Sequence, residues 1–231
     1  MQFEDLNWMD VESYLKQDDR VVVITGACEQ HAYLSLQTDI RVPTAVARAA
    51  AEQERVLIAP AIPFGISPYF TAFPGTISLR VETFTLVVRE VLSELIRQGF
   101  RRILVSNGHG GNTGPLESLL IELCNAHPGL KIRMFQSWNH PYTLKVAEEA
   151  GLKVNHASWA ESFPFTRVAE SPSAVKPDAS APDVANAAAF RAALGDGNFG
   201  GPYQAPDDVV QRSFDAMVRA MVEELRALKT D

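Results

Sequence analysis

The segment 102–114, which reads RILVSNGHGGNTG, joins a hydrophobic run to a glycine-rich turn that leads into a helical pattern. Its first part, Arg102 to Ser106, is short and aliphatic, as is typical of a strand buried on both faces. Residues from Pro115 to Ala126 then have the character of a helix. The segment therefore predicts a strand, a turn and a helix in succession.

The same alternation extends along most of the chain. Further strands are expected at 21–25, 56–59 and 131–135, and further helices at 44–54, 79–98 and 142–150. This order predicts an α/β fold with three layers, in which a mostly parallel sheet lies between helices on both faces. Because such sheets bind ligands beyond the carboxyl ends of their strands, residues at those ends are the first functional candidates.

The C-terminal third has a different character. Residues 162–183 contain prolines at 164, 172, 177 and 182, which disfavour long helices and central strands and suggest a segment that covers a surface, such as a lid. From Asp207 to Leu228 an amphipathic helical pattern returns. No repeat or composition shift marks a linker, so one domain spanning residues 1–231 is expected.

Composition excludes several classes of protein. The chain has 46% hydrophobic and 21% charged residues and no apolar run near 18 residues, which argues against a membrane span. A net charge of -7 without a basic cluster argues against nucleic acid as a partner. No secretory signal is readable and only two cysteines occur, so a cytoplasmic protein with free thiols is expected.

Three segments concentrate side chains that bind metals. Glu29 and His31 follow the first strand, with Asp39 eight residues later, and an N-cap or first-turn role is the alternative for Asp39. His109 lies in the glycine-rich turn, which is a poor match to a phosphate loop because neither GxGxxG spacing nor a following Lys-Ser/Thr is present. The third segment supplies His156 and Glu161. The other two histidines, His127 and His140, adjoin prolines at helix boundaries and are expected to have no role in the site.

These motifs resemble the creatininase (creatinine amidohydrolase) family. Its hallmarks are a Glu-x-His segment followed by Asp, an Asn-Gly-His-x-x-Asn loop and a later His-Ala-Gly-x-x-Glu-Thr-Ser segment. In this chain they read GACEQHAYLSLQTD, SNGHGGN and HASWAES, and the stretch FPGTISL at 73–79 and Gly200-Gly201-Pro202 are also similar. The resemblance spans most of the chain.

The resemblance implies a creatininase-like amidohydrolase that holds two divalent metal ions (Zn, Mn or Fe) and forms a homo-oligomer such as a hexamer. Glu29 and His109 would bind one ion, His31 and Glu161 the other, and Asp39 would bridge both. A metal-bridged hydroxide would attack a non-peptide C–N bond of a cyclic amide, formamide or related small nitrogen compound. His156 would pass a proton to the departing nitrogen.

The chain also departs from the family pattern. The family commonly has EQHGPHLPLGTD where this chain has EQHAYLSLQTD, one residue shorter, which makes Asp39 the least secure ligand. Phe70 stands where many members have His, and Ser158 replaces a glycine. Ser67, Phe70, Asn112 and Trp138 are the expected substrate contacts, and Tyr33, Tyr69, Phe73 and Trp159 are further aromatic candidates for the pocket wall.

Two other functions compete with this hypothesis. In the first alternative, the altered loop has abolished catalysis and left a binding or assembly protein, although every expected type of metal ligand is present. In the other, Cys28 would act as a nucleophile with His31, but no third residue that would orient the pair is evident.

Overall fold

The computed structural model describes residues 1–179, 182 and 184–230, and its centre is a sheet of four parallel strands. The strands are β1 (Arg20–Thr25), β2 (Leu57–Ile58), β3 (Arg102–Asn107) and β4 (Lys131–Phe135), in the order β2-β1-β3-β4. β1 pairs with β3 from Arg20 opposite Arg102 to Thr25 opposite Asn107. The carboxyl ends of the two central strands therefore lie side by side.

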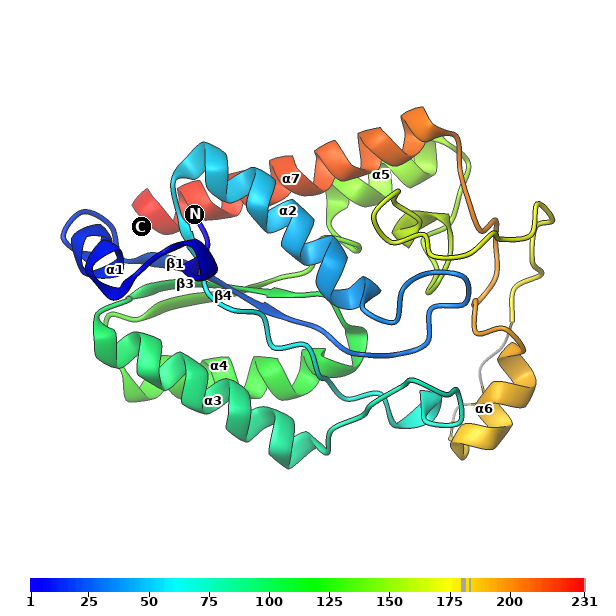
Figure 1. Ribbon diagram of the computed structural model, residues 1–231, viewed down its shortest axis with the longest axis horizontal. Coiled ribbons are helices and arrows are strands. Elements are labelled where there is room, and N and C mark those ends of the chain that lie inside the picture. The colour runs from blue at the N-terminus through cyan, green and yellow to red at the C-terminus, as the bar shows by residue number, and fades with distance from the viewer. Residues whose placement is uncertain (180–181, 183, 231) are drawn as a thin grey trace.

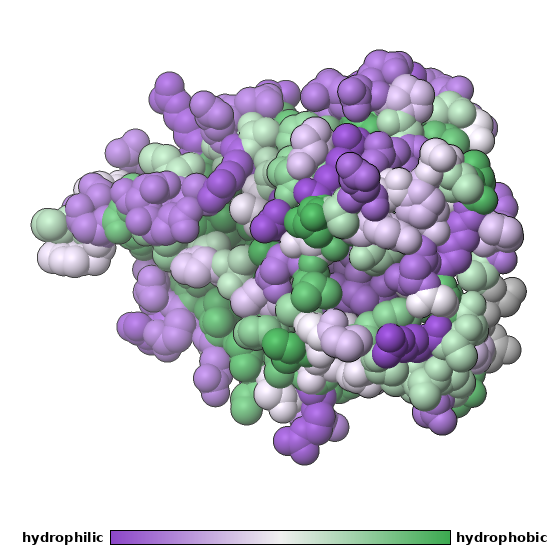
Figure 2. All heavy atoms as spheres, turned by 45° about the vertical axis from the view of Figure 1, so that its right-hand side comes forward, coloured by the Kyte–Doolittle hydropathy of each residue, from purple (hydrophilic) through white to green (hydrophobic). Residues whose placement is uncertain are grey.

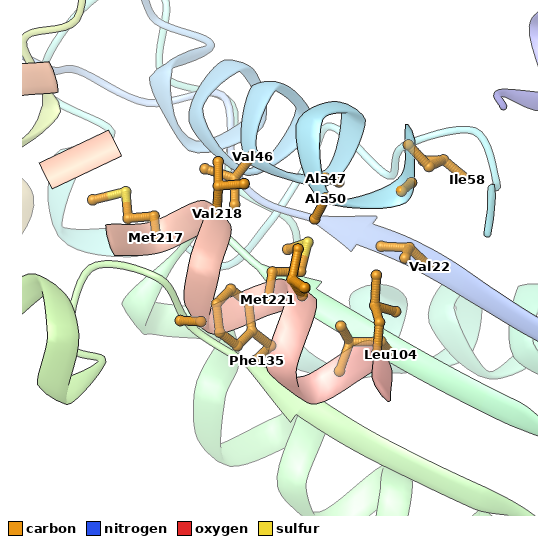
Figure 3. Close-up of a cluster of buried hydrophobic side chains, with 14 of the residues drawn as sticks. Val22, Val46, Ala47, Ala50, Ile58, Leu104, Phe135, Met217, Val218 and Met221 are labelled. Atoms are coloured by element: carbon orange, nitrogen blue, oxygen red, sulfur yellow. The ribbon is translucent and has the colours of Figure 1, made fainter. Parts of the chain in front are cut away.

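Helices cover both faces of the sheet, as expected for three layers (Figure 1). On one side lie α2 (Thr38–Glu54), α5 (Pro141–Glu149) and α7 (Asp207–Thr230), and on the other α3 (Val81–Gln98) and α4 (Thr113–Ala126). Successive residues of β1 face opposite layers, so Val22 packs with α2 and α7 whereas Val21 and Val23 pack with α3 and α4. Figure 3 shows the first of these cores, where Val46 of α2 lies beside Val218 of α7.

Most elements expected from the sequence are present, but two helices were not anticipated. These are α1 (Trp8–Leu15) and α6 (Ala187–Leu194), which is capped by the Asn186 side chain. Four short 3-10 helices complete the elements: η1 (Phe3–Asp5), η2 (Pro68–Phe70), η3 (Gly110–Asn112) and η4 (Trp159–Glu161). Within 162–183, the described residues form no further helix or strand, and residues 180, 181 and 183 lie outside the described part.

The start of α2 corrects a prediction. The sequence suggested a helix from Thr44, begun by Pro43, but α2 begins at Thr38 and Pro43 lies inside it. The backbone N–H groups of Ile40 and Arg41 already donate to the carbonyl of Gln37, at 3.0 and 2.8 Å. The helix passes through proline because only one intrahelical bond is lost, the bond that the carbonyl of Asp39 would have accepted. Asp39 is thereby a residue of the first helical turn.

No helix among the described residues is long and apolar enough to span a membrane.

Candidate metal centre

Five side chains with metal-binding atoms meet beyond the carboxyl ends of β1 and β3. Glu29 and His31 follow β1, His109 follows β3, Asp39 lies in the first turn of α2 and Glu161 in η4. All but Glu161 are at most 5% exposed, and the side chain of Glu161 is 20% exposed. The topology thus brings together the residues that the sequence had placed in three separate segments.

Asp39 connects two groups of these residues, because each of its oxygens faces a different histidine. Its Oδ1 lies 3.0 Å from Nε2 of His31, and its Oδ2 lies 3.0 Å from Nδ1 of His109. Glu29 Oε1 is 3.3 Å from His109 Nδ1, and Glu161 Oε1 is 3.8 Å from His31 Nε2. Two sets share Asp39 and could each hold one ion: Glu29, Asp39 and His109, and His31, Asp39 and Glu161. Glu29, His31 and His156 form a third set of side chains close enough to hold an ion.

The outer nitrogen of each imidazole is held by a backbone carbonyl. His31 Nδ1 lies 3.2 Å from the Glu29 carbonyl oxygen, and His109 Nε2 lies 2.9 Å from that of Ile66. Since a carbonyl oxygen only accepts, these nitrogens carry the protons and donate. In the neutral imidazoles the inner nitrogens present lone pairs to the carboxylates, the arrangement that orients metal-binding histidines.

Several buried polar atoms in the cluster have no hydrogen-bond partner. They are Glu29 Oε2, His31 Nε2 and Asp39 Oδ2. Lone pairs and anionic oxygens that face one another at about 3 Å repel unless a proton or a metal ion lies between them. The residues present therefore fit divalent cations, and nitrogen and carboxylate ligands suit Zn, Mn and Fe.

The pKa values of His31, His109 and Asp39 also show that the site favours positive charge. Burial acts to lower the pKa of His31, but the charges of Asp39 and Glu161 outweigh it and the pKa lies well above its ordinary value. Burial also acts to lower the pKa of His109. Glu29 and Asp39 outweigh it, and the pKa of His109 again lies well above its ordinary value. Burial would raise the pKa of Asp39, yet His31 and His109 hold it below its ordinary value.

Glycines at two strand ends allow Asp39 to approach the sheet. A Cβ atom added at Gly26 would lie 2.3 Å from the Asp39 carbonyl oxygen, and one added at Gly108 would lie 1.9 Å from it. Pro43 has no N–H to bond this carbonyl, which instead packs against the two glycines. The group that approaches the glycine-rich turn closely is thus the start of α2.

The loop before Asp39 is one residue shorter than the family pattern, yet the Asp39 side chain lies in the cluster. The loop turns back on itself, since the Leu34 N–H donates to the His31 carbonyl at 2.8 Å and the Glu29 N–H to the Leu36 carbonyl at 3.0 Å.

His156 lies beside the cluster. Its Nδ1 is 3.8 Å from Glu29 Oε1, and its ring centroid is 4.4 Å from that of His31. The ring stacks on Phe70 at 5.1 Å, so the phenylalanine that replaces the family's histidine supports it. Burial, aided by the charge of His31, lowers the pKa of His156 below its ordinary value.

A cavity of about 730 Å³ opens at Glu29, His109 and His156. Segments that line it, among them α6, lie on the right of Figure 1, and Figure 2 shows hydrophobic and hydrophilic residues interleaved at the surface on that side. Of the expected substrate contacts, Phe70 and Trp138 line the cavity, as does Tyr69. Phe190, Phe199 and Asn155 also line it and were missed. The helix α6 and the turn after it left no pattern that ties Phe190 and Phe199 to the site, whereas Asn155 directly precedes the predicted His156.

Ser67 and Asn112 lie behind His109 and do not line this cavity. Both are completely buried. The Asn112 side chain accepts from the Ile66 N–H at 3.0 Å and donates to the Gly26 carbonyl at 3.1 Å, while Ser67 Oγ is 3.3 Å from His109 Nε2. These contacts hold the loops that carry the cluster. Three aromatic candidates, Tyr33, Phe73 and Trp159, are likewise absent from the lining of this cavity.

The cysteines and the other two histidines make contacts outside the cluster. Cys28 Sγ is within 3.4 Å of the Gly75 carbonyl oxygen, and both cysteines are free. His140 caps α5, because its Nδ1 accepts from the Tyr142 N–H at 3.3 Å, and His127 ends α4.

Comparison with known proteins places these features in context. The family model "Creatininase: Creatinine amidohydrolase" matches residues 4–225. A creatinine amidohydrolase of Pseudomonas putida is 34% identical over 116 residues, which cover 47% of this chain and 45% of that protein. A mycofactocin precursor peptide peptidase of Mycobacterium tuberculosis is 39% identical over 107 residues, or 42% of each chain. The matched part thus spans less than half the length of these curated relatives.

Solved structures match over a larger share. An E122Q mutant creatininase of Zn-Zn type superimposes with a TM-score of 0.78 over 98% of this chain and 97% of that one, at 24% identity. At this identity the likeness shows the shared fold.

Proposed function

Because the chain belongs to the creatininase family, whose model matches residues 4–225, we propose that it is a metal-dependent hydrolase of a C–N bond outside the peptide backbone. The substrate class would be a cyclic amide, a formamide or a related small nitrogen compound. The observation that carries this proposal is the buried cluster in which two carboxylates and two imidazole lone pairs face one another around Asp39.

The proposed site holds two divalent ions of Zn, Mn or Fe. Glu29 and His109 would bind the first, His31 and Glu161 the second, and Asp39 would bridge them, one oxygen to each. Two divalent ions carry a charge of +4 and the three carboxylates a charge of -3, so one further anion would neutralise the centre. When bound, such a pair of ions lowers the pKa of water and polarises the carbonyl that is attacked.

The other residues of the site would bind substrate and move the proton. His156 lies at the cavity wall, where its ring contacts those of Phe70 and Phe199. Its Nδ1 faces the cluster and would deliver a proton to the departing nitrogen. Ser67 and Asn112, which we expected to touch substrate, would instead hold the loops around His109.

The alternative of a degraded binding protein finds less support. A chain that had lost catalysis would be expected to lose ligands, whereas the five expected side chains are all present and converge. We further propose that the protein is cytoplasmic and forms a homo-oligomer. Light scattering of the purified protein tests the oligomeric state.

The decisive experiment measures metal content and turnover together. Protein purified without chelator should contain about two equivalents of transition metal per chain by plasma mass spectrometry. It should release amine, ammonia or formate from members of a panel of lactams, cyclic amides and formylated amines, and lose this activity with chelator. Protein that binds no transition metal under any reconstitution would refute the proposal.

A further inference from the structure

Five aromatic side chains line the cavity next to the candidate metal centre. Tyr69 and Phe70 come from η2, Trp138 from the loop after β4, Phe190 from α6 and Phe199 from the turn beyond it. Segments far apart in the sequence thus contribute rings to one wall.

Four of these rings, those of Tyr69, Phe70, Phe190 and Phe199, contact one another and reach the cluster. Tyr69 packs on Phe190 at 5.4 Å between ring centroids, and Phe70 on Phe199 at 6.1 Å. Phe70 and Phe199 both contact the His156 ring, at 5.1 and 5.0 Å. An apolar surface therefore begins at the proposed proton donor and continues outward.

The wall offers no counter-charge to an anion. Among the described residues that line the cavity there is no lysine or arginine, and the groups that can carry charge are Glu29, His109 and His156, all at the cluster. An acidic substituent would lose its hydration without gaining a partner. An uncharged ring would gain from burial against other rings, by about 25 cal/mol for each Å² removed from water.

The cavity is also larger than a small ring compound needs. At a share of about 30 Å³ for each water molecule, its volume of about 730 Å³ equals roughly two dozen waters. It lies in the range typical of sites that bind drug-sized ligands.

We propose that the substrate is an amide with a bulky, uncharged aromatic or apolar substituent, which the wall of Tyr69, Phe70, Trp138, Phe190 and Phe199 binds, and that substrates acidic at this position are rejected. This inference rests on the proposed hydrolase function and names its substrate class.

A binding experiment with three probes tests it. The probes are naphthylacetamide, a carboxylated naphthylacetamide and acetamide, each added to zinc-loaded protein and followed by saturation-transfer NMR and by quenching of tryptophan fluorescence. Naphthylacetamide should bind at least tenfold more tightly than the other two. Equal binding of the three, or preference for the acidic or the small probe, would overturn the inference.

Substitutions in the wall locate the effect. Phe190→Ala and Phe199→Ala should each weaken naphthylacetamide binding about tenfold. Phe165→Ala, which truncates a partly exposed ring outside this cavity, should not. Because Phe190 and Phe199 also pack in the buried cluster of Phe70, Phe73 and Leu194, a gain-of-function variant complements these two truncations. Val184→Lys adds a cation at an exposed position of the lining and should strengthen binding of the acidic probe, whereas Val168→Lys, outside the lining, should leave it unchanged.

Turnover separates the two proposals. If naphthylacetamide binds but metal-loaded protein cleaves no amide of any kind, the proposed function fails and the ligand class stands. If acetamide or acidic amides are cleaved as fast as naphthylacetamide, the hydrolase stands and the substrate class is wrong.

Discussion

At the scale of single residues, Asp39 is the link between the two halves of the candidate centre. Its oxygens lie 3.0 Å from His31 Nε2 and from His109 Nδ1, whereas Glu29 and Glu161 each face only one of these histidines within 4 Å. Loss of Asp39 therefore removes a ligand from both groups, and loss of Glu29 or Glu161 from one.

This difference gives a prediction about metal content. Asp39→Ala should lose both equivalents of metal and all hydrolysis, whereas Glu161→Gln should retain about one equivalent. Plasma mass spectrometry after gel filtration measures both. Glu52→Ala, at an exposed position on the same helix, is the control and should retain two. An Asp39→Ala protein with both metals would contradict the bridging role.

A second residue-scale prediction concerns pH and stability. Burial acts to raise the pKa of Asp18, but hydrogen bonds and charge from Arg20, with help from Arg102, lower it below its ordinary value. A lowered pKa means that the folded chain favours the carboxylate, so the stabilisation is present above the unfolded pKa of about 3.9 and is lost as the pH falls through the folded value. Asp18→Asn should lower Tm at pH 7, and the difference from wild type should shrink below about pH 4. A difference in Tm that stays constant down to pH 2 would exclude this linkage.

At the scale of elements, the position of α2 depends on the two strand ends beneath it. Gly108→Ala would place a Cβ atom 1.9 Å from the Asp39 carbonyl oxygen, so the first turn of α2 must move away from the sheet. We expect at least a tenfold loss of metal affinity, measured by competition with a fluorescent zinc chelator. Gly114→Ala in α4, where a Cβ atom meets nothing within 4 Å, should leave affinity unchanged. Unaltered affinity in Gly108→Ala would show that α2 does not position Asp39 in this way.

One buried cation bonds to the C-terminal parts of two helices. Arg20 is 1% exposed and donates to the Glu54 carbonyl near the end of α2, at 3.1 Å, and to the Leu225 carbonyl of α7, at 2.9 Å, while its side chain also pairs with Asp18. Arg20→Met should lower the free energy of unfolding by about 3–5 kcal/mol in urea titration. Arg97→Met removes an exposed pair with Glu94 and should leave the free energy of unfolding nearly unchanged. Similar losses in the two variants would rule out a special role for Arg20.

At the scale of the whole molecule, bound ions would join distant parts of the chain. The proposed ligands come from the loop after β1, from α2, from the turn after β3 and from η4, so the cations act as cross-links that the unfolded chain lacks. At a hundredfold excess over Kd, zinc should raise the Tm of chelator-treated protein by on the order of 5–10 °C in calorimetry. Asp39→Ala protein should not respond, and a wild-type Tm that is independent of metal would count against the site.

The sequence predicted the layers better than it predicted the cavity. Residues 131–135 form a strand and 79–98 contain α3 because their hydrophobic patterns reflect burial against the sheet, which local sequence records. The predicted start of α2 was wrong because proline is a common first residue of helices, whereas Pro43 is the sixth residue of α2. Phe190 and Phe199 reach the cavity only through the path of the chain after Pro182, and no spacing in the sequence encodes that path.

The candidate metal ligands and the aromatic wall of the cavity are carried by different elements of the fold. Most of the candidate ligands are held by ends of β-strands and by the helix start pressed against them, whereas the aromatic wall belongs to η2, a loop and the region around α6. Mutations can therefore accumulate in the wall without disturbing the ions. A lineage that inherits this architecture is free to acquire new substrates one side chain at a time while the reaction itself is preserved.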